Sequence, residues 1–280
     1  MPLEGRRPVS RPLWFVAILK AAFPGRFFLA RATRLPLLGA FMDRLLFHGD
    51  RVIYLSRDNV VPVDESVAPA GSMALPSQVV ERFIEEASTL WVMDRCLCRD
   101  AAGCRDYPID LGCLFLGDAA AGINPALGHP VSREEALAHT RRCRDAGLVH
   151  MVGRNKLDTL WLGVGPGQKL LTICHCCPCC CLWRVLPHLA PEISSRVTAM
   201  PGVSVRVGPD CTGCGACAHV CFVDAITMSG GRAVIGEGCR GCGRCVEACP
   251  QGAIELTLDG PVIERVTAAI AAVVDVSPSP

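Results

Sequence analysis

The sequence predicts an α+β fold in which a mixed helix-and-strand region precedes a small repeated module. Apolar residues recur at helical spacing over residues 77–93, and a capping box at Ser132–Glu135 indicates a second helix. Two apolar stretches near residues 160 and 170 have the character of strands. Residues 211–250 contain an internal repeat, and a short β-rich run follows each copy.

The bulk composition narrows the classes of function. The chain has 280 residues, long enough for two domains or for one domain with an appended module. Half of its residues are apolar (50%), which is enough for a sizeable core. A net charge of +1 and an aromatic content of 5% give no electrostatic or stacking basis for nucleic-acid binding, so no nucleic-acid partner is expected.

Residues 1–75 are predicted to form a basic and apolar N-terminal arm. Its segment 13–47 combines arginines with many large apolar side chains, a composition typical of contact with a membrane surface or a partner protein. A helical arm packed on the protein's own core explains the pattern equally well. The apolar run from Leu13 stops at Lys20, so the sequence does not predict a membrane-spanning helix.

Three further regions follow the arm. Residues 76–200 form a Cys-rich domain with a helix from Ser77 to about Met93, a helix from Ser132 to about Ala146, and strands at Thr159–Val164 and Lys169–Cys174. Prolines and a glycine within 187–202 mark a linker. Residues 201–260 form the repeated module, and residues 261–280 form a C-terminal helix and tail, with the helix running to about Val276.

Cysteine is the most unusual feature, with 19 in the chain. The cysteines occur in tight groups, some of them directly adjacent, whereas a disulfide requires a specific separation of two Cα atoms. Clustered cysteines in a chain of this length favour metal binding in a reducing compartment, so we expect a cytoplasmic location, with surface contact to a membrane as an option.

The repeated module has a defined cysteine spacing. Each copy reads C-x₂-C-x₂-C-x₃-C, and the two copies comprise Cys211, Cys214, Cys217, Cys221 and Cys239, Cys242, Cys245, Cys249. Three cysteines on a loop and a helix start reach three irons of one cube, and the fourth points toward the other cube. Zinc knuckles do not need the third cysteine or the x₃ arm. The spacing therefore indicates iron–sulfur ligation.

These motifs resemble the bacterial-type dicluster [4Fe–4S] ferredoxin family over residues of about 203–258. The resemblance implies a ferredoxin-like βαβ–βαβ module with two [4Fe–4S] clusters. One cluster would be bound by Cys211, Cys214, Cys217 and Cys249, and the other by Cys239, Cys242, Cys245 and Cys221. Pro250 follows the second motif, but Phe222 stands where the first motif usually has proline.

A second group of cysteines lies upstream, at Cys96, Cys98, Cys104 and Cys113. Four cysteines on loops within 18 residues suffice for a third cluster, and Arg95, Arg99 and Arg105 are close enough in sequence to offset its negative charge. Zinc binding and unligated core thiols are the alternatives.

The third group places six cysteines in eight residues, namely Cys174, Cys176, Cys177, Cys179, Cys180 and Cys181. Their side chains must point in at least two directions, so they cannot all bind one metal. Four of them would bind a fourth cluster, or the group would share one cluster with the upstream cysteines. His175 is expected to be hydrogen-bonded rather than a ligand, and Cys143 is expected in the core.

The upstream groups together resemble uncharacterised ferredoxin-like proteins of anaerobes, a resemblance that implies no activity. We expect a multi-cluster iron–sulfur electron-transfer protein with one or two clusters beyond the first two. Its partner would be a redox protein or an oxidoreductase subunit, and it would be a carrier rather than a stand-alone enzyme. A reductase with a substrate-facing cluster or dithiol at Cys174–Cys181 is one alternative. A redox sensor or cluster-handling protein is the other.

Overall fold

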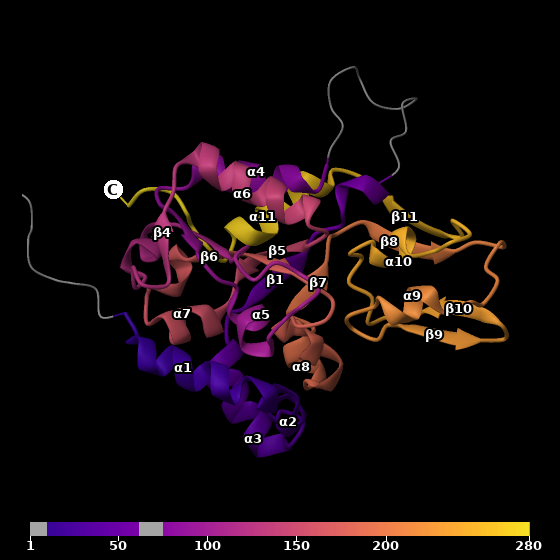
Figure 1. The fold of residues 1–280 in the computed structure, drawn as a ribbon, viewed down its shortest axis with the longest axis horizontal. Coiled ribbons are helices and arrows are strands. Elements are labelled where there is room, and N and C mark those ends of the chain that lie inside the picture. Colours follow the sequence, from indigo (N-terminus) through magenta and orange to yellow (C-terminus); the bar gives the residue numbers. More distant parts are fainter. Residues whose placement is uncertain (1–9, 62–74, 280) are drawn as a thin grey trace, which may run out of the picture.

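The centre of the protein is a seven-stranded mixed sheet, in a computed structural model that describes residues 10–61 and 75–279 (Figure 1). The strands are β1 (Arg51–Tyr54), β2 (Leu90–Met93), β3 (Leu114–Leu116), β4 (Gly128–Pro130), β5 (Val149–Arg154), β6 (Leu171–Cys176) and β7 (Val197–Ala199). They lie in the order β4-β2-β3-β6-β5-β1-β7, and every pair is antiparallel except β1 with β7. Strand β6, whose end carries Cys174 and Cys176, is therefore central.

Three helices cover one face of this sheet: α4 (Ser77–Glu86), α6 (Arg133–Asp145) and α11 (Val262–Ala271) (Figure 1). Their apolar stripes, which include Val80 and Val266, pack with strand residues such as Ile173 in one buried cluster. Helix α11 comes from the C-terminal end of the chain. It therefore ties that end to the central domain rather than to the module just before it in sequence.

The opposite face carries other helices of the central domain. Helix α5 (Leu97–Ala102), α7 (Lys156–Leu162), the short 3-10 helix η6 (Leu182–His188) and α8 (Pro191–Ser194) lie nearest the sheet (Figure 1). The arm lies outside them as α1 (Leu13–Ala22), α2 (Arg26–Ala32) and α3 (Pro36–Met42), followed by one helical turn at Asp43–Phe47. Two further 3-10 turns, Asp118–Gly122 and Gly167–Lys169, connect strands of the sheet.

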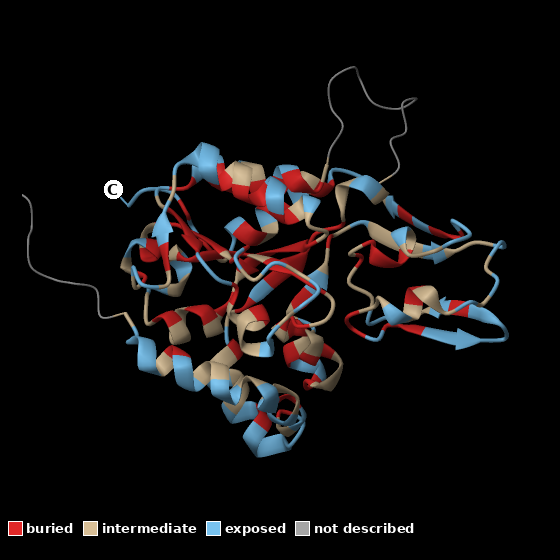
Figure 2. Ribbon diagram, in the orientation of Figure 1, coloured by how far each residue is buried: buried red, intermediate tan, exposed pale blue. Residues whose placement is uncertain are grey.

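The arm is amphipathic. Its inner face buries Val16, Ala30 and Phe47, whereas most of its outer face is exposed (Figure 2). The large apolar side chains that it exposes are Leu13, Trp14, Ile18, Phe28, Leu29, Leu35, Leu37, Leu38, Phe41 and Leu45. By length and composition alone, Leu13–Ala32 is long and apolar enough to cross a membrane. The expectation that this segment is too short to span a membrane is therefore wrong, because α1 continues past Lys20 and leads through a 3-10 turn at Phe23–Gly25 into α2. The Lys20 ammonium pairs with Asp100 on α5.

The C-terminal module contains two strand–helix–strand units. Its elements are β8 (Val203–Val207), α9 (Ala216–His219), β9 (Ile226–Ser229), β10 (Arg232–Ile235), α10 (Arg244–Glu247) and β11 (Ile254–Leu258). Strand β8 pairs antiparallel with β11, and β9 pairs antiparallel with β10. In Figure 1 the module stands beside the sheet, at the end where β1 and β7 lie.

The general α+β class is confirmed, and so is the capping box, in which Ser132 and Glu135 bond each other's backbone at the start of α6. Two elements were predicted wrongly. The helix from Ser77 ends at Glu86, because Leu90–Met93 is buried on both faces as strand β2. The strand expected at Thr159–Val164 is helix α7, which the Asn155 side chain caps by accepting a hydrogen bond from the backbone N–H of Leu157.

Three further boundaries differ from the sequence-based expectation. The second expected strand is displaced to Leu171–Cys176, so it includes the first cysteines of the dense run. The C-terminal helix ends at Ala271 rather than near Val276. Part of the region expected to be the arm, Arg51–Tyr54, is a strand of the central sheet.

Candidate metal centres

The two upstream cysteine groups interleave in space. Six thiols line one cavity between the arm and the sheet, which we call the chamber: Cys96, Cys98, Cys113, Cys174, Cys176 and Cys181. Four other thiols lie within 4.8 Å of one another, and we call them the four-thiol site: Cys104, Cys177, Cys179 and Cys180. Cys177 also borders the chamber. Cys104 thus lies apart from the other cysteines of its sequence group, because the chain turns after α5 and places Cys104 near the turn that follows β6.

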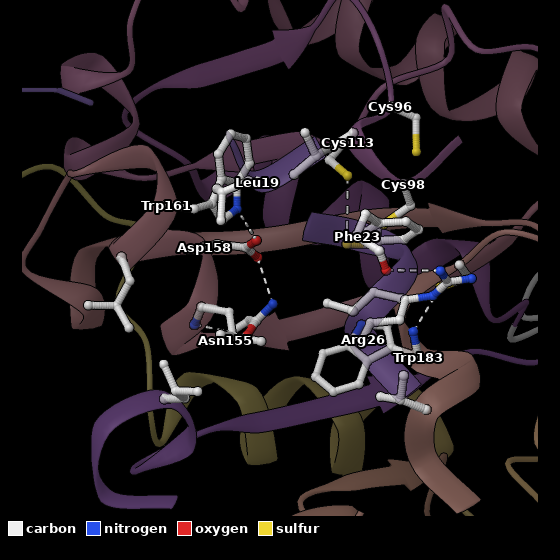
Figure 3. A pocket seen from close by; sticks show the side chains of 18 of the residues that line it. Leu19, Phe23, Arg26, Cys96, Cys98, Cys113, Asn155, Asp158, Trp161 and Trp183 are labelled. Carbon is white, nitrogen blue, oxygen red and sulfur yellow. Dashed lines mark hydrogen bonds between the residues drawn. The ribbon is translucent and has the colours of Figure 1, made fainter. Parts of the chain in front are cut away.

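The chamber has a volume of about 420 Å³ (Figure 3). Helices α1 and α2 supply apolar walls such as Leu19 and Phe23, and Trp161 and Trp183 complete them. The sulfur atoms of Cys113 and Cys174 lie 3.7 Å apart, and Cys176 contacts the sulfur of Met151 at 3.3 Å. Buried thiols around an open apolar volume are a donor set that fits an iron–sulfur cluster.

The electrostatics of the chamber favour a cationic occupant. Hydrogen bonds from Cys113 and Cys98 hold the pKa of the Cys96 thiol well below its usual value. The pKa of Cys176 is lowered as well, whereas the pKa values of the other four chamber thiols are raised, so two thiolates in apolar surroundings require positive charge nearby. Arg99 of α5 supplies one such charge: it is 1% exposed and donates to the carbonyl of His175 at 2.7 Å. Burial lowers the pKa of Arg99, but the thiols of Cys96 and Cys113 outweigh burial and raise it.

The other two arginines of that segment do not face the chamber. Arg95 is exposed and pairs with Asp100, and Arg105 is exposed as well. Of the three arginines that the sequence offered, only Arg99 is buried beside the cysteines. Its orientation depends on α5 and on the carbonyls of Leu111 and His175, which lie far apart in sequence.

Sequence reasoning missed the polar groups in the chamber wall. The Asp158 carboxylate accepts hydrogen bonds from the Trp161 indole at 2.9 Å and the Asn155 amide at 2.9 Å (Figure 3). It also accepts one from the Thr172 hydroxyl at 2.8 Å. Burial raises the pKa of Asp158 although these bonds oppose the shift. In the sequence, the only local sign of these polar groups is the Asn155–Asp158 pair, and that pair is also typical of an ordinary helix N-terminus.

Three buried histidines lie on the far side of β6 from the arm. The Nδ1 atoms of His150 and His175 are 2.8 Å apart, and the Nε2 atom of His139 lies 2.9 Å from the carbonyl of Gly112. Burial lowers the pKa of His150 to about 4, so this histidine is neutral at physiological pH. Cys143, which is fully buried, lies 3.5 Å from His139. His175 thus has a hydrogen-bond partner and Cys143 is buried, and His139, Cys143 and His175 also place three possible ligand atoms within 4.8 Å of one another.

The eight cysteines of the C-terminal module fall into two sets. Cys211, Cys214, Cys217 and Cys249 line one small cavity. In the other set, burial and then the neighbouring thiols of Cys242, Cys239 and Cys221 together raise the pKa of Cys245 to about 12. The backbone repeats across the two sets: the N–H of Ala225 donates to Cys221, and that of Ala253 to Cys249, each at 3.3 Å. Such hydrogen bonds to sulfur tune the reduction potential of a cluster.

Phe222, the residue that replaces proline after the first motif, lies at the contact between the module and the central domain. It is 5% exposed, and its ring lies 4.7 Å from that of Tyr54 on β1. Arg244 on α10 donates to the carbonyl of Cys176 at 2.7 Å, and the Ser56 hydroxyl donates to the carbonyl of Gly241 at 2.7 Å. The second thiol set and the chamber therefore lie on either side of one packed interface.

Comparison with known proteins supports the iron–sulfur assignment of the module. Residues 210–254 match the family model of the 4Fe–4S dicluster domain. No curated protein and no solved structure matches the chain. The match and the cysteine clusters together support an iron–sulfur electron-transfer protein that binds [4Fe–4S] clusters.

Proposed function

We propose that this protein relays electrons between the two clusters of its C-terminal module and a third cluster in the chamber. The observation that carries the proposal is the six-thiol chamber, whose rim touches the module through Arg244 and the carbonyl of Cys176. When bound, each cluster accepts and releases one electron at a time. The cysteines would hold the irons, Arg99 would offset thiolate charge, and the arm would exclude water from the chamber.

The geometry of each region supports the ligand sets that we propose. Within the module, the repeated backbone hydrogen bonds and the shared cavity support one cluster on Cys211, Cys214, Cys217 and Cys249. The remaining four cysteines of the module would hold the second cluster in a βαβ–βαβ arrangement. The redox partner, an oxidoreductase or another electron carrier, would exchange electrons with the cluster nearest the surface, because Cys214 is the exposed cysteine of its set.

The first test is the count of iron and acid-labile sulfide on anaerobically purified protein, with EPR spectra after dithionite reduction. Two clusters in the module and one in the chamber give about twelve irons and about twelve sulfides per chain. Cys113→Ser should remove the chamber signal and about four of each, while Cys143→Ala should remove neither. About eight irons in the unmodified protein, unchanged by Cys113→Ser, would rule out a cluster in the chamber.

A second candidate function is supported by the surplus of thiols. A cube has four irons, whereas six thiols line the chamber, so two thiols remain beside a cavity of about 420 Å³. A spare dithiol next to an apolar cavity suits a reductase acting on an uncharged, apolar substrate. This alternative predicts two chamber thiols that react with iodoacetamide after dithionite reduction and are protected after mild oxidation. Mass spectrometry of the alkylated peptides separates the two functions, because in a pure relay the two spare thiols form no disulfide and are alkylated equally before and after mild oxidation.

We also propose that the protein works in the cytoplasm, docked through its arm on an anionic membrane surface. The exposed apolar side chains of the arm are accompanied by the exposed cations Arg31, Arg34 and Arg44, which complement anionic lipid headgroups. A surface position preserves the contacts of the arm with the domain, including the Arg34 guanidinium on the carbonyl of Leu189 and Lys20 on Asp100. Insertion across the membrane would break both contacts.

A further inference from the structure

The four-thiol site differs in geometry from the other thiol sets. The sulfur atoms of Cys104, Cys177, Cys179 and Cys180 all lie within 4.8 Å of one another. Cys104 and Cys179 are separated by 3.7 Å, and Cys179 and Cys180 by 3.5 Å. Residues from two distant segments of the chain thus place four sulfur atoms around a single point.

These separations match a single ion better than a cube. A tetrahedral ion with metal–sulfur bonds of about 2.3 Å holds its four thiolates roughly 3.8 Å apart. A cube attaches its four thiolates to four different irons, which spreads them more widely. The two sets of thiols in the module, all of which the structure describes, provide a comparison within the same protein. In neither set do the four sulfur atoms all lie within 4.8 Å of one another.

The local backbone also fits a single-ion site. Cys177 and Cys180 are separated by two residues, Pro178 and Cys179, which is the short spacing of a metal knuckle. The N–H of Cys180 donates to the sulfur of Cys177 at 3.3 Å across this turn. Arg184 fixes the turn from outside by donating to the carbonyl of Cys179 at 3.0 Å. Hydrogen bonds of this kind orient ligands around a metal.

We propose that the four-thiol site binds one thiophilic divalent ion, Zn²⁺ or Fe²⁺, in a tetrahedral sulfur site without inorganic sulfide. The ion joins the loop after α5 to the turn after β6. These two segments carry all six chamber thiols on their flanks, so the ion fixes the spacing of the chamber without taking part in electron transfer. The proposal is independent of the occupant of the chamber, because the ten thiols of the two upstream groups divide into the six chamber thiols and the four of the four-thiol site.

The test measures metals and acid-labile sulfide together on full-length protein purified without oxygen. Cys104→Ser should lose one metal ion per chain and no sulfide, because a single-ion site contains none. Leu148→Ala is the matched control, since Leu148 is buried in the same apolar cluster but offers no ligand atom, and it should retain all metal. Loss of about four irons with about four sulfides in Cys104→Ser would overturn the proposal.

A measurement on the unmodified protein covers the case in which Cys104→Ser does not fold. If zinc fills the site, X-ray absorption at the zinc edge should show four sulfur neighbours at about 2.3 Å. If iron fills it, the Mössbauer spectrum should contain a mononuclear ferrous component besides the clusters. Either spectrum supports the proposal. A zinc-free protein whose iron is entirely accounted for by clusters would refute it, whatever the chamber contains.

Discussion

Asp50, directly before β1, is a buried carboxyl whose ionisation should lower stability. Its Oδ1 accepts a hydrogen bond from the backbone N–H of Lys156 at 2.7 Å. Burial is the main cause that raises its pKa from 3.8 to about 7, and the nearby Asp158 adds to it. Between about pH 4 and pH 7 the unfolded chain gives up this proton while the folded protein retains it, so the free energy of unfolding falls as pH rises.

Asp50→Asn should remove this part of the pH dependence, because the amide oxygen still accepts from Lys156 and carries no charge. The difference between 3.8 and about 7 corresponds to on the order of 4 kcal/mol at full ionisation. Urea unfolding without oxygen should show that the free energy of unfolding of the variant, relative to that of the unmodified protein, is higher at pH 8 than at pH 5. Parallel curves for the two proteins would mean that Asp50 is ionised in the fold.

The arm is the element that we expect to bind the membrane surface, through its exposed apolar side chains. Leu37 and Phe41 on α3 are 89% and 64% exposed, and they lie beside the cation Arg34. Leu37→Gln combined with Phe41→Gln should weaken binding to vesicles that contain anionic lipid by on the order of 100-fold, taking about 1.5 kcal/mol for each inserted side chain. Cosedimentation with vesicles measures the change.

The control for the arm is Val234→Gln, which alters an exposed apolar residue of β10 outside the arm. This variant should bind vesicles as the unmodified protein does. Binding should also weaken as salt is raised, because anionic headgroups attract Arg31, Arg34 and Arg44. Equal binding by the double variant and the unmodified protein would show that the arm is not a membrane contact.

The whole molecule depends on the packed interface between the module and the central domain. Arg244 is 6% exposed and satisfies the carbonyl of Cys176, the residue that also lines the chamber. Arg244→Met leaves that carbonyl buried without its donor, which should lower the free energy of unfolding by about 2 kcal/mol. Urea unfolding measures the loss, and the exposed Arg206→Met in the same module is the control.

A second readout distinguishes a purely structural role for Arg244 from one in coupling the two regions. Freeze-quench EPR of Arg244→Met should show the module clusters reduced at the normal rate and the chamber cluster reduced more slowly. The iron content should stay unchanged. If the chamber signal forms at the rate of the unmodified protein, electrons reach it by a route that does not need this interface.

The sequence by itself determined the local features. The spacing of cysteines in the two repeats identified iron–sulfur ligation, because the ligands of such clusters lie within a few residues of one another. The capping box at Ser132–Glu135 fixed the start of a helix through contacts three residues apart. The abundance of clustered cysteines upstream likewise indicated metal binding before any fold was known.

Only the tertiary structure decided how the upstream cysteines divide. Cys104 belongs with Cys98 by sequence, yet the turn after α5 places it against Cys179, which is 75 residues away. The chamber exists because the arm closes over β6, and Asp158 and Arg99 enter its wall through pairings between distant segments. Sequence spacing specifies a ligand set when the ligands share one loop. Where the ligands of one site come from two distant segments, the packing of the strands next to those segments determines which cysteines come together.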